Sequence, residues 1–334
     1  MASGNISLTE RQAVLLTVAF YMFSTCAMVL ANKYALNAMP VAWLLLWCQM
    51  AIAVLLLKVT EAFGVLRMPQ INLVTAKALI PLITINVLGL GVNTLCLIYV
   101  DTSFYQVARG LVLPFTVIFA YAFLRQSSSK TVLIACFIVF CGFYTGVTSD
   151  INVSSLGVFF GIVSSITTSL HAIVIKQSLS AVNNSSIDLV YYNNLLSFIV
   201  ITPIILFSGE ISAVSEHYAQ EGSAVLHKFF FGVILTGVLG FMVNLAGFLQ
   251  ISKTSPTTHM ISGAVRGVLQ TFLGYMVFSE VITFGRMAGI VLILAGGALY
   301  TWAKDQEMRA NTKPTYIPMT QQDIDEEDQD GHKA

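Results

Sequence analysis

The chain has 334 residues, of which 56% are hydrophobic and only 10% are charged, and its formal net charge is zero. Soluble globular domains carry roughly 25% charged residues, so this composition excludes a soluble globule and predicts a polytopic membrane protein. The absence of a basic excess argues against a nucleic-acid partner. The five cysteines lie in apolar segments without CxxC spacing, a pattern typical of small buried side chains rather than of disulfides or a metal site.

A helix that crosses a bilayer needs about 20 mostly apolar residues. Ten segments meet this requirement: 12–32, 41–59, 78–99, 104–124, 131–148, 156–176, 189–208, 229–250, 256–278 and 283–302. We therefore predict an all-α membrane protein with ten transmembrane helices. Residues 1–11 form the predicted N-terminal extension, and the acidic, polar segment 304–334 is a predicted disordered tail.

The distribution of Lys and Arg predicts the orientation in the membrane. If the N-terminus lies in the cytosol, twelve of the 17 Lys and Arg side chains fall on the cytosolic side and three on the far side. The remaining two, Arg109 and Arg266, lie within predicted spans. Cytosolic loops carry the excess of positive charge in membrane proteins, so we expect both termini to be cytosolic.

Two stretches of the first half recur in the second half. Arg109 and Arg266 occupy matching positions in “ARGLVLPF” and “VRGVLQTF”. Lys33 and Lys176 match in “ANKYALNAMP” and “VIKQSLSAVN”. The two matches together favour an internal duplication.

Two repeats of five helices, 12–148 and 156–303, would have inverted topologies, because five is an odd number. Inverted repeats are an architecture of secondary transporters, whose substrate site lies near the bilayer midplane between the repeats. The duplication therefore points to a transporter.

The two intramembrane arginines predict the charge of the substrate. A charge at the bilayer centre costs at least about 2.5–3.5 kcal/mol and usually faces the interior or a water-filled cavity. No Asp or Glu lies inside any predicted span, so an anionic ligand would be the partner of Arg109 and Arg266. The planar fork of arginine suits phosphate. The alternative for each arginine is snorkelling or pairing with backbone carbonyl groups.

Depth separates the two arginines. Arg266 lies about 15 Å along a helix from the start of its span, and Arg109 only about 8 Å from the start of its own. We therefore expect Arg266 to be the direct phosphate contact, whereas Arg109 could instead serve the lumenal entrance.

Polar side chains that could recognise the rest of a ligand cluster in two further spans. “YYNN” opens the seventh span and offers two amides and two aromatic rings, although a helix cap in an interfacial aromatic belt is the alternative. “SPTTHMISGAVRG” opens the ninth span with hydroxyls, glycines and His259, for which an interhelical hydrogen bond is the alternative. We expect Gly142, Gly296 and Gly297 to serve close helix packing. No enzyme motif is present, so no catalytic residue, metal or cofactor is expected.

With these motifs, residues 12–303 resemble the nucleotide-sugar transporters of the drug/metabolite transporter superfamily. “YYNN” is similar to the FYNN motif of GDP-sugar carriers. “FYQVARGL”, “LQISKTSPTTHMISG” and “GGALYTWAK” are most similar to the GDP-fucose branch. The resemblance implies the drug/metabolite transporter fold and a Golgi antiporter that brings GDP-fucose into the lumen in exchange for GMP.

The residues and the resemblance together give a predicted substrate site. Its members are Tyr21, Lys33, Tyr105, Arg109, Lys176, Tyr192, Asn193, Asn194, Asn244, His259, Ser262, Gly263 and Arg266. The resemblance implies that Asn193 and Asn194 meet the guanine, with Tyr192 nearby, and that the segment from His259 to Arg266 lines the nucleotide and phosphate site. The expected partners are GDP-fucose, GMP and membrane lipids, with a homodimer as one option for assembly.

Two departures keep other substrates open. GDP-mannose carriers have GALNK where this chain has “GAVRG”, which counts against GDP-mannose, and related carriers tend to have lysine in place of Arg266. GDP-mannose, a UDP-sugar and a triose phosphate remain alternatives. A membrane-embedded transferase is a more distant one, because it would need a buried acid or histidine pair that the spans lack.

Overall fold

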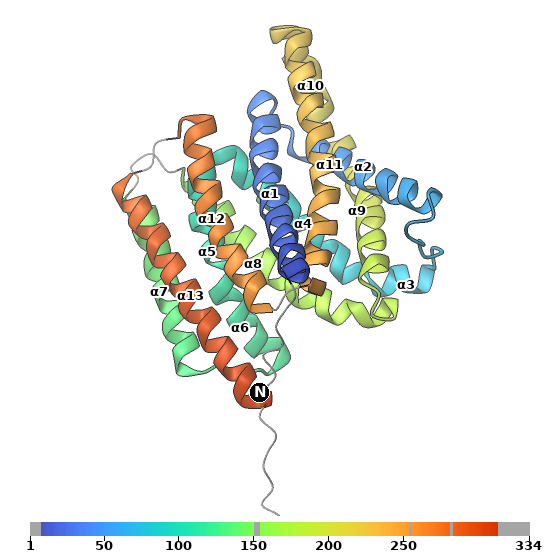
Figure 1. Cartoon of the computed structure of the whole chain (residues 1–334). Helices are drawn as coiled ribbons and strands as arrows, with labels where there is room; N and C mark the ends of the chain where they lie inside the picture. The colour runs from blue at the N-terminus through green and yellow to red at the C-terminus, as the bar shows by residue number, and fades with distance from the viewer. Residues whose placement is uncertain (1–7, 150–153, 254–255, 281–282, 313–334) are drawn as a thin grey trace, which may run out of the picture.

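The protein is described by a computed structural model over residues 8–149, 154–253, 256–280 and 283–312. All regular elements in these ranges are helices (Figure 1). They are α1 (Leu8–Ala38), α2 (Ala42–Ala62), α3 (Leu73–Ala78), α4 (Ile80–Tyr99), α5 (Thr102–Gly110), α6 (Val112–Leu124), α7 (Lys130–Thr148), α8 (Ser155–Ser178), the 3₁₀ helix η1 (Leu179–Val182), α9 (Ser186–Ser208), α10 (Glu210–Glu221), α11 (Ser223–Lys253), α12 (Pro256–Phe278) and α13 (Phe284–Thr312).

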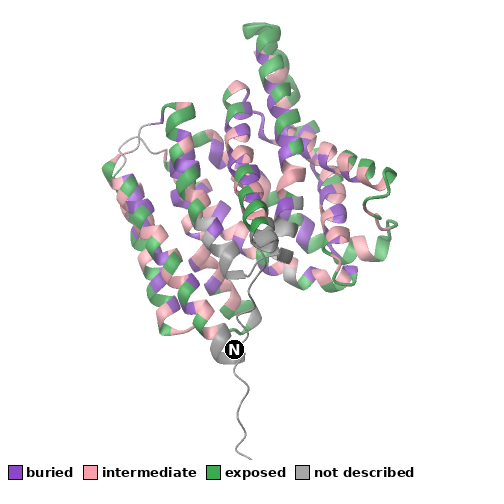
Figure 2. Ribbon diagram, viewed as in Figure 1, coloured by how far each residue is buried: buried purple, intermediate pink, exposed green. Residues whose placement is uncertain are grey.

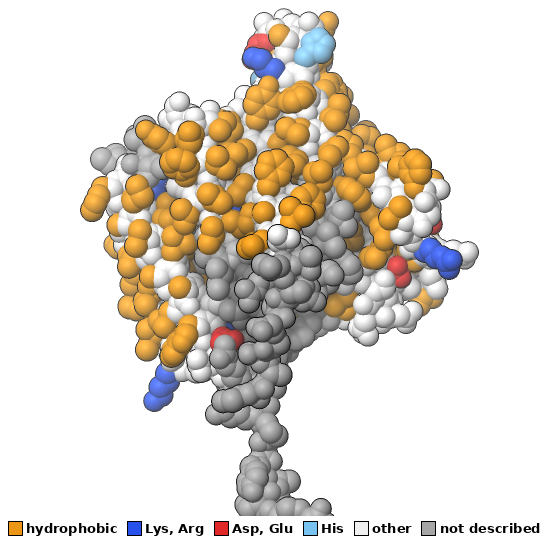
Figure 3. Space-filling view, viewed as in Figure 1, with side chains coloured by type: hydrophobic (Ala, Val, Ile, Leu, Met, Phe, Trp, Pro, Cys, Tyr) orange, Lys and Arg blue, Asp and Glu red, His pale blue; other side chains and the backbone are white. Residues whose placement is uncertain are grey.

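The helices agree with the membrane class that composition predicts. Within the described ranges, nine helical stretches are long and apolar enough to cross a membrane. α12 has 23 residues and coincides with the predicted ninth segment, and its described apolar part is the shorter Val265–Phe278. Apolar side chains cover the middle of the molecule in space-filling view, with charged side chains towards its edges (Figure 3). Such a surface suits a lipid environment.

The predicted segment 104–124 is two helices rather than one. α5 and α6 meet at Leu111. Pro114 has no backbone N–H, so the carbonyl oxygen of Gly110, four residues earlier, has no α-helical donor. The apolar run therefore marks the span correctly but hides a break one third of the way along it.

The last helix is longer than the sequence predicts. α13 runs to Thr312, past the predicted start of the tail. Lys304 Nζ donates to Glu307 Oε2 over 2.7 Å, and Glu307 Oε1 accepts the backbone N–H of Ser129 over 3.0 Å, which ties this end of α13 to α7. Residues 313–334 lie outside the described residues.

The two sequence halves interleave instead of forming separate lobes. The most extensive helix pairs are α7 with α13, α1 with α11, α4 with α8, and α2 with α9, and each joins a helix of the first half to one of the second. Buried residues lie where these helices contact one another, whereas exposed residues lie on the outer faces and on α10, which projects beyond the bundle (Figure 2). Any site between the halves is therefore built from both.

Glycines allow the α7–α13 contact to be close. A Cβ on Gly142 would lie 2.8 Å from the carbonyl oxygen of Gly289, and one on Gly296 would lie 2.9 Å from that of Ala135. The packing role predicted for Gly142 and Gly296 is thus confirmed. The same prediction is wrong for Gly297: no described atom beyond its own stretch of helix lies within 4 Å of its would-be Cβ, and it lines a cavity instead.

We expect Gly142→Ala to lower the thermal stability of the detergent-solubilised protein, since the new methyl group would meet backbone rather than a flexible side chain. Overpacking of this kind costs about 1–3 kcal/mol. Gly297→Ala is the matched control and should leave the melting temperature nearly unchanged. Equal melting temperatures for the two variants would contradict the close contact between α7 and α13.

Candidate functional site

The break between α5 and α6 places Arg109 in the last turn of α5, inside the bundle. Hydroxyl groups from α8 satisfy backbone on both sides of the break: Ser165 donates to Ala108 O over 2.7 Å, and Ser169 donates to Val112 O over 2.8 Å. Buried carbonyl groups in a membrane protein need such internal donors. α8 therefore stabilises the irregular backbone that carries Arg109.

A polar relay orients the Arg109 side chain. Arg109 Nη1 donates to the Tyr105 hydroxyl over 3.0 Å, and its guanidinium carbon lies 5.5 Å from the Tyr105 ring centroid. The Tyr105 hydroxyl donates in turn to Asn93 Oδ1 over 2.7 Å, which also accepts from Ser164 over 3.0 Å. Tyr105 is only 2% exposed, so it positions the arginine from behind.

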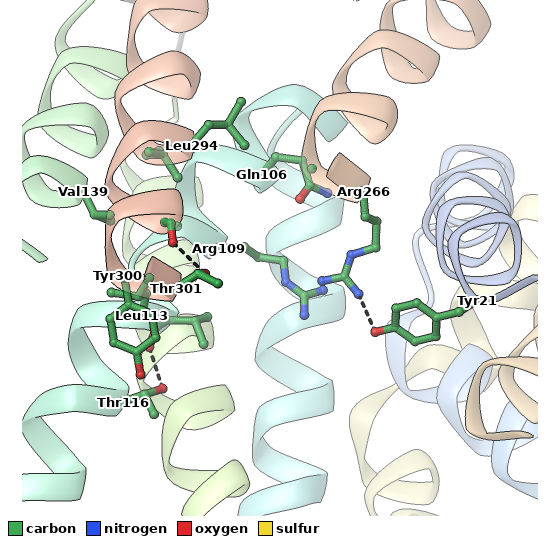
Figure 4. Close-up of a pocket in the computed structure, with 15 residues that line it drawn as sticks. Tyr21, Gln106, Arg109, Leu113, Thr116, Val139, Arg266, Leu294, Tyr300 and Thr301 are labelled. Atoms are coloured by element: carbon green, nitrogen blue, oxygen red, sulfur yellow. Dashed lines mark hydrogen bonds between the residues drawn. The ribbon is translucent and has the colours of Figure 1, made fainter. Parts of the chain in front are cut away.

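Arg266 approaches from the opposite half of the sequence. It lies on α12, and its Nη1 donates to the hydroxyl of Tyr21 on α1 over 3.3 Å. Its Nε atom is buried without a hydrogen-bond partner among the described residues. In Figure 4 the guanidinium groups of Arg109 and Arg266 lie next to each other.

The two arginines line one cavity of about 370 Å³. The cavity is bounded by α1, α5, α6, α7, α12 and α13, and is thus built from both halves of the sequence (Figure 4). Its lining residues are Tyr21, Gln106, Arg109, Gly110, Val112, Leu113, Thr116, Val139, Arg266, Gly267, Ile293, Leu294, Gly297, Tyr300 and Thr301.

The cavity carries positive charge without a counter-charge from the described part of the protein. No Asp or Glu is among its described lining residues, and no described carboxylate forms an ion pair with Arg109 or Arg266. Two neighbouring cations repel each other, more strongly in a low-dielectric interior than in water. The arrangement is therefore suited to an anion that bridges both guanidinium groups.

Lys33 has a different environment from the one predicted. Its buried ammonium group donates to Leu97 O over 2.6 Å and to Val100 O over 2.7 Å, at the end of α4. These bonds satisfy carbonyl groups that the end of a helix leaves open. Lys33 does not line the described cavity, so a substrate role for it stays a prediction.

A second polar cluster lies near Lys33, at the N-terminus of α5. The Glu280 carboxylate accepts the backbone N–H groups of Thr102 and Ser103 over 2.7 and 3.0 Å. Arg286 donates to the Ser103 hydroxyl over 2.6 Å and to Asp101 Oδ2 over 3.4 Å. These contacts fix the start of the helix that carries Arg109.

The “YYNN” residues on α9 lie outside the described cavity lining. The Tyr192 hydroxyl donates to Gln70 O over 3.0 Å and accepts from Asn72 N over 2.8 Å. Asn194 Nδ2 donates to Val190 O within its own helix. Asn193 Oδ1 is buried with no described donor, which leaves it as an open acceptor.

The other predicted residues divide between described and undescribed positions. Asn244 is exposed on α11 and donates to Gly240 O of its own helix, and Ser262 is buried on α12 one turn before Arg266. The structure does not describe the side chains of Lys176 and His259 or the surroundings of Gly263, so the roles predicted for these three residues stay predictions. The structure thus brings together Tyr21, Arg109 and Arg266, with Tyr105 behind them.

Sequence reasoning missed several cavity residues. Gln106 precedes Arg109 by three residues and therefore shares its helix face, a signal that was available in the sequence. Tyr300 and Thr301 belong to “GGALYTWAK”, but nothing in their spacing indicates that α13 would turn them towards the arginines. Only the packing of α13 against α5 and α7 places them there.

Apolar helices that enclose a cationic cavity are the features of a multi-pass membrane transporter, and comparison with known proteins agrees. The sequence matches the Triose-phosphate Transporter family over residues 11–301. The chain belongs to this family.

Curated relatives cover most of the chain. GDP-fucose transporter 1 of Dictyostelium discoideum is 33% identical over 87% of this chain and 81% of its own length. GDP-fucose transporter 1 of Mus musculus is 30% identical over 89% and 84%. A solved crystal structure that shares 12% sequence identity superposes with a TM-score of 0.52, over 88% of this chain and 98% of the other, and supports the fold alone.

We expect Lys33→Met to lower thermal stability, since two buried carbonyl oxygens would lose their donor at a cost of about 1–3 kcal/mol. Any stabilisation that added GMP, used here as a probe ligand, produces in the wild-type protein should persist, because Lys33 lies outside the described cavity lining. Lys130→Met, which changes an exposed lysine at the start of α7, is the control and should change little. A Lys33→Met protein with normal stability and no response to GMP would instead assign Lys33 to the substrate.

Proposed function

We propose that the protein is a Golgi antiporter that imports GDP-fucose into the lumen in exchange for GMP. The observation that carries this proposal is the pair Arg109 and Arg266 in one cavity without a described carboxylate. Guanidinium groups bind phosphate oxygens through charge-assisted, often bidentate hydrogen bonds. The nucleotide and the sugar are assigned from the relatives named GDP-fucose transporters and from the sequence motifs.

The guanine is assigned to the α9 side of the molecule. Asn193 offers an acceptor oxygen that no described group uses, and guanine carries N–H donors on its Watson–Crick edge. Asn194 and Tyr192 are already engaged with backbone groups, so we assign them to holding this part of α9. The base would then lie outside the described lining of the cavity that holds the phosphate groups.

The charge of the cavity also accounts for exchange. An empty cavity leaves two guanidinium groups unneutralised. Switching the empty cavity from one side of the membrane to the other would bring this uncompensated charge into a low-dielectric layer. GMP in one direction and GDP-fucose in the other would each supply the missing negative charge. We therefore propose that the loaded states are the ones that reorient.

We further propose that the chain has two inverted five-helix repeats, in which α1, α2, α4, α5 with α6, and α7 correspond in order to α8, α9, α11, α12 and α13. The helix pairs support this proposal. If each helix is replaced by its counterpart in the other half, the α1–α11 pair becomes α8–α4 and the α6–α8 pair becomes α12–α1. All four of these helix pairs are in contact. The α2–α9 and α7–α13 pairs map onto themselves. Both termini would then lie on the cytosolic side, and rocking of the halves would expose the cavity alternately.

Arg266→Ala and Arg109→Ala should each weaken GMP binding roughly 10- to 100-fold, the cost of a lost hydrogen bond to a charged group. The measurement is competition by GMP against uptake of labelled GDP-fucose into GMP-loaded proteoliposomes. Arg67→Ala removes an exposed arginine and serves as the control, with no expected effect. Normal exchange by both cavity variants would refute the phosphate site.

The same assay tests the substrate. GMP should compete with labelled GDP-fucose, whereas UMP and inorganic phosphate should compete poorly. Strong competition by UMP would favour a UDP-sugar, and strong competition by inorganic phosphate would favour a small phosphorylated metabolite. Uptake without a nucleotide inside the vesicles would contradict exchange.

A further inference from the structure

Gln106 is a polar side chain of the cavity to which the sequence assigns no role. It lies on α5, one turn before Arg109, and in Figure 4 it sits beside the two arginines. Its Nε2 atom donates to Oε1 of Gln270 on α12, and Gln270 Nε2 donates to the backbone carbonyl oxygen of Thr25 over 3.0 Å. Gln270 is 1% exposed and does not line the cavity.

This chain of hydrogen bonds fixes the orientation of both amide groups. The carbonyl oxygen of Thr25 can only accept, so Gln270 must present its NH₂ group there and turn its oxygen towards Gln106. Gln106 must then present its own NH₂ group to that oxygen. An amide that could otherwise flip is thereby held with one defined end facing the ligand space.

The end that remains is an acceptor. Gln106 Oε1 would lie 3.8 Å from a Cβ on Gly267, which also lines the cavity, and it accepts no hydrogen bond from any described residue. A glycine at this position keeps the space beside the oxygen open. The cavity therefore combines two cationic donors with one fixed neutral acceptor.

We propose that Gln106 is a specificity-determining residue that accepts a hydrogen bond from a hydroxyl group of the substrate close to its phosphate groups. Fully ionised phosphate oxygens only accept hydrogen bonds, so they can satisfy Arg109 and Arg266 but not Gln106 Oε1. A ribose or sugar hydroxyl can donate to it. This inference rests on the proposed phosphate site and adds to it a requirement for a hydroxylated neighbour.

A double comparison of protein and ligand tests the assignment. Kd values are measured for purified wild-type protein and Gln106→Leu with GDP-fucose, GDP, GMP, 2′-deoxy-GMP and 3′-deoxy-GMP. Gln106→Leu should weaken binding about five- to tenfold for ligands that carry the recognised hydroxyl. The substitution should change the Kd little for the ligand that lacks this hydroxyl. The wild-type protein should bind that ligand about five- to tenfold more weakly than the hydroxylated counterpart.

The pattern across ligands identifies the hydroxyl. An effect confined to GDP-fucose, and absent for GDP, locates it on the sugar. An effect on GMP that disappears for one of the deoxy analogues locates it on the ribose. Gln106→Met, which also lacks a strong acceptor, replaces Gln106→Leu if that variant does not fold.

Thr116→Val is the matched control. Thr116 also lines the cavity, but its hydroxyl already donates to Val112 O of its own helix over 2.7 Å, so its removal should affect all ligands equally. Unchanged Kd values for Gln106→Leu, or an equal loss for all five ligands, would overturn the inference. If the Arg266→Ala variant also binds these ligands normally, the proposed phosphate site is refuted as well. If Arg266→Ala loses binding, only the role proposed for Gln106 is refuted.

Discussion

The constraint on which this structure depends is that backbone polar groups in an apolar layer must be satisfied from within the protein. A helix satisfies its own backbone groups along its length but not at its ends. Here α5 ends, and α6 begins, inside the bundle. The Glu280 carboxylate accepts the N–H groups of Thr102 and Ser103 at the start of α5, and the hydroxyls of Ser165 and Ser169 donate to the carbonyl groups of Ala108 and Val112 on the two sides of its junction with α6. These contacts anchor both ends of α5 and the start of α6 around Arg109. The irregular backbone, and the charge that follows it, both depend on side chains from the other half of the sequence.

The cavity repeats this dependence on both halves. Arg109 comes from α5 and Arg266 from α12, and each guanidinium is oriented by a tyrosine hydroxyl, from Tyr105 and Tyr21 respectively. A buried hydroxyl directs an arginine without neutralising it, so the positive charge stays available to a ligand. Where the protein needs a neutralised charge, as at Asp101 and Arg286 near the end of the bundle, it provides a carboxylate. The difference between the two sites is consistent with a structural role for one and ligand binding for the other.

Much of this organisation could be predicted from the sequence. Apolar runs of about 20 residues mark the helices because the thickness of the bilayer sets their length, and α12 begins and ends where its run does. Arg109 and Arg266 stand out because a charge in such a run is costly. The break at Leu111 is not readable from the sequence, because Pro114 can either kink a membrane helix or end it. The length of α13 was missed because its polar end is stabilised by Glu307 against Ser129, a contact between distant segments.

The sequence by itself determined the all-helical membrane class, the candidate arginines and the absence of acidic residues from the spans, since each follows from composition along single segments. Tertiary structure alone decided which polar residues meet. It placed Lys33 on the carbonyl groups of α4 and the “YYNN” side chains outside the described cavity. It also brought Arg266 on α12 to the face of α5 that carries Gln106 and Arg109. The physical reason is that helix packing, rather than sequence spacing, sets the rotation of each helix about its axis, and this rotation decides which face of a helix meets the ligand.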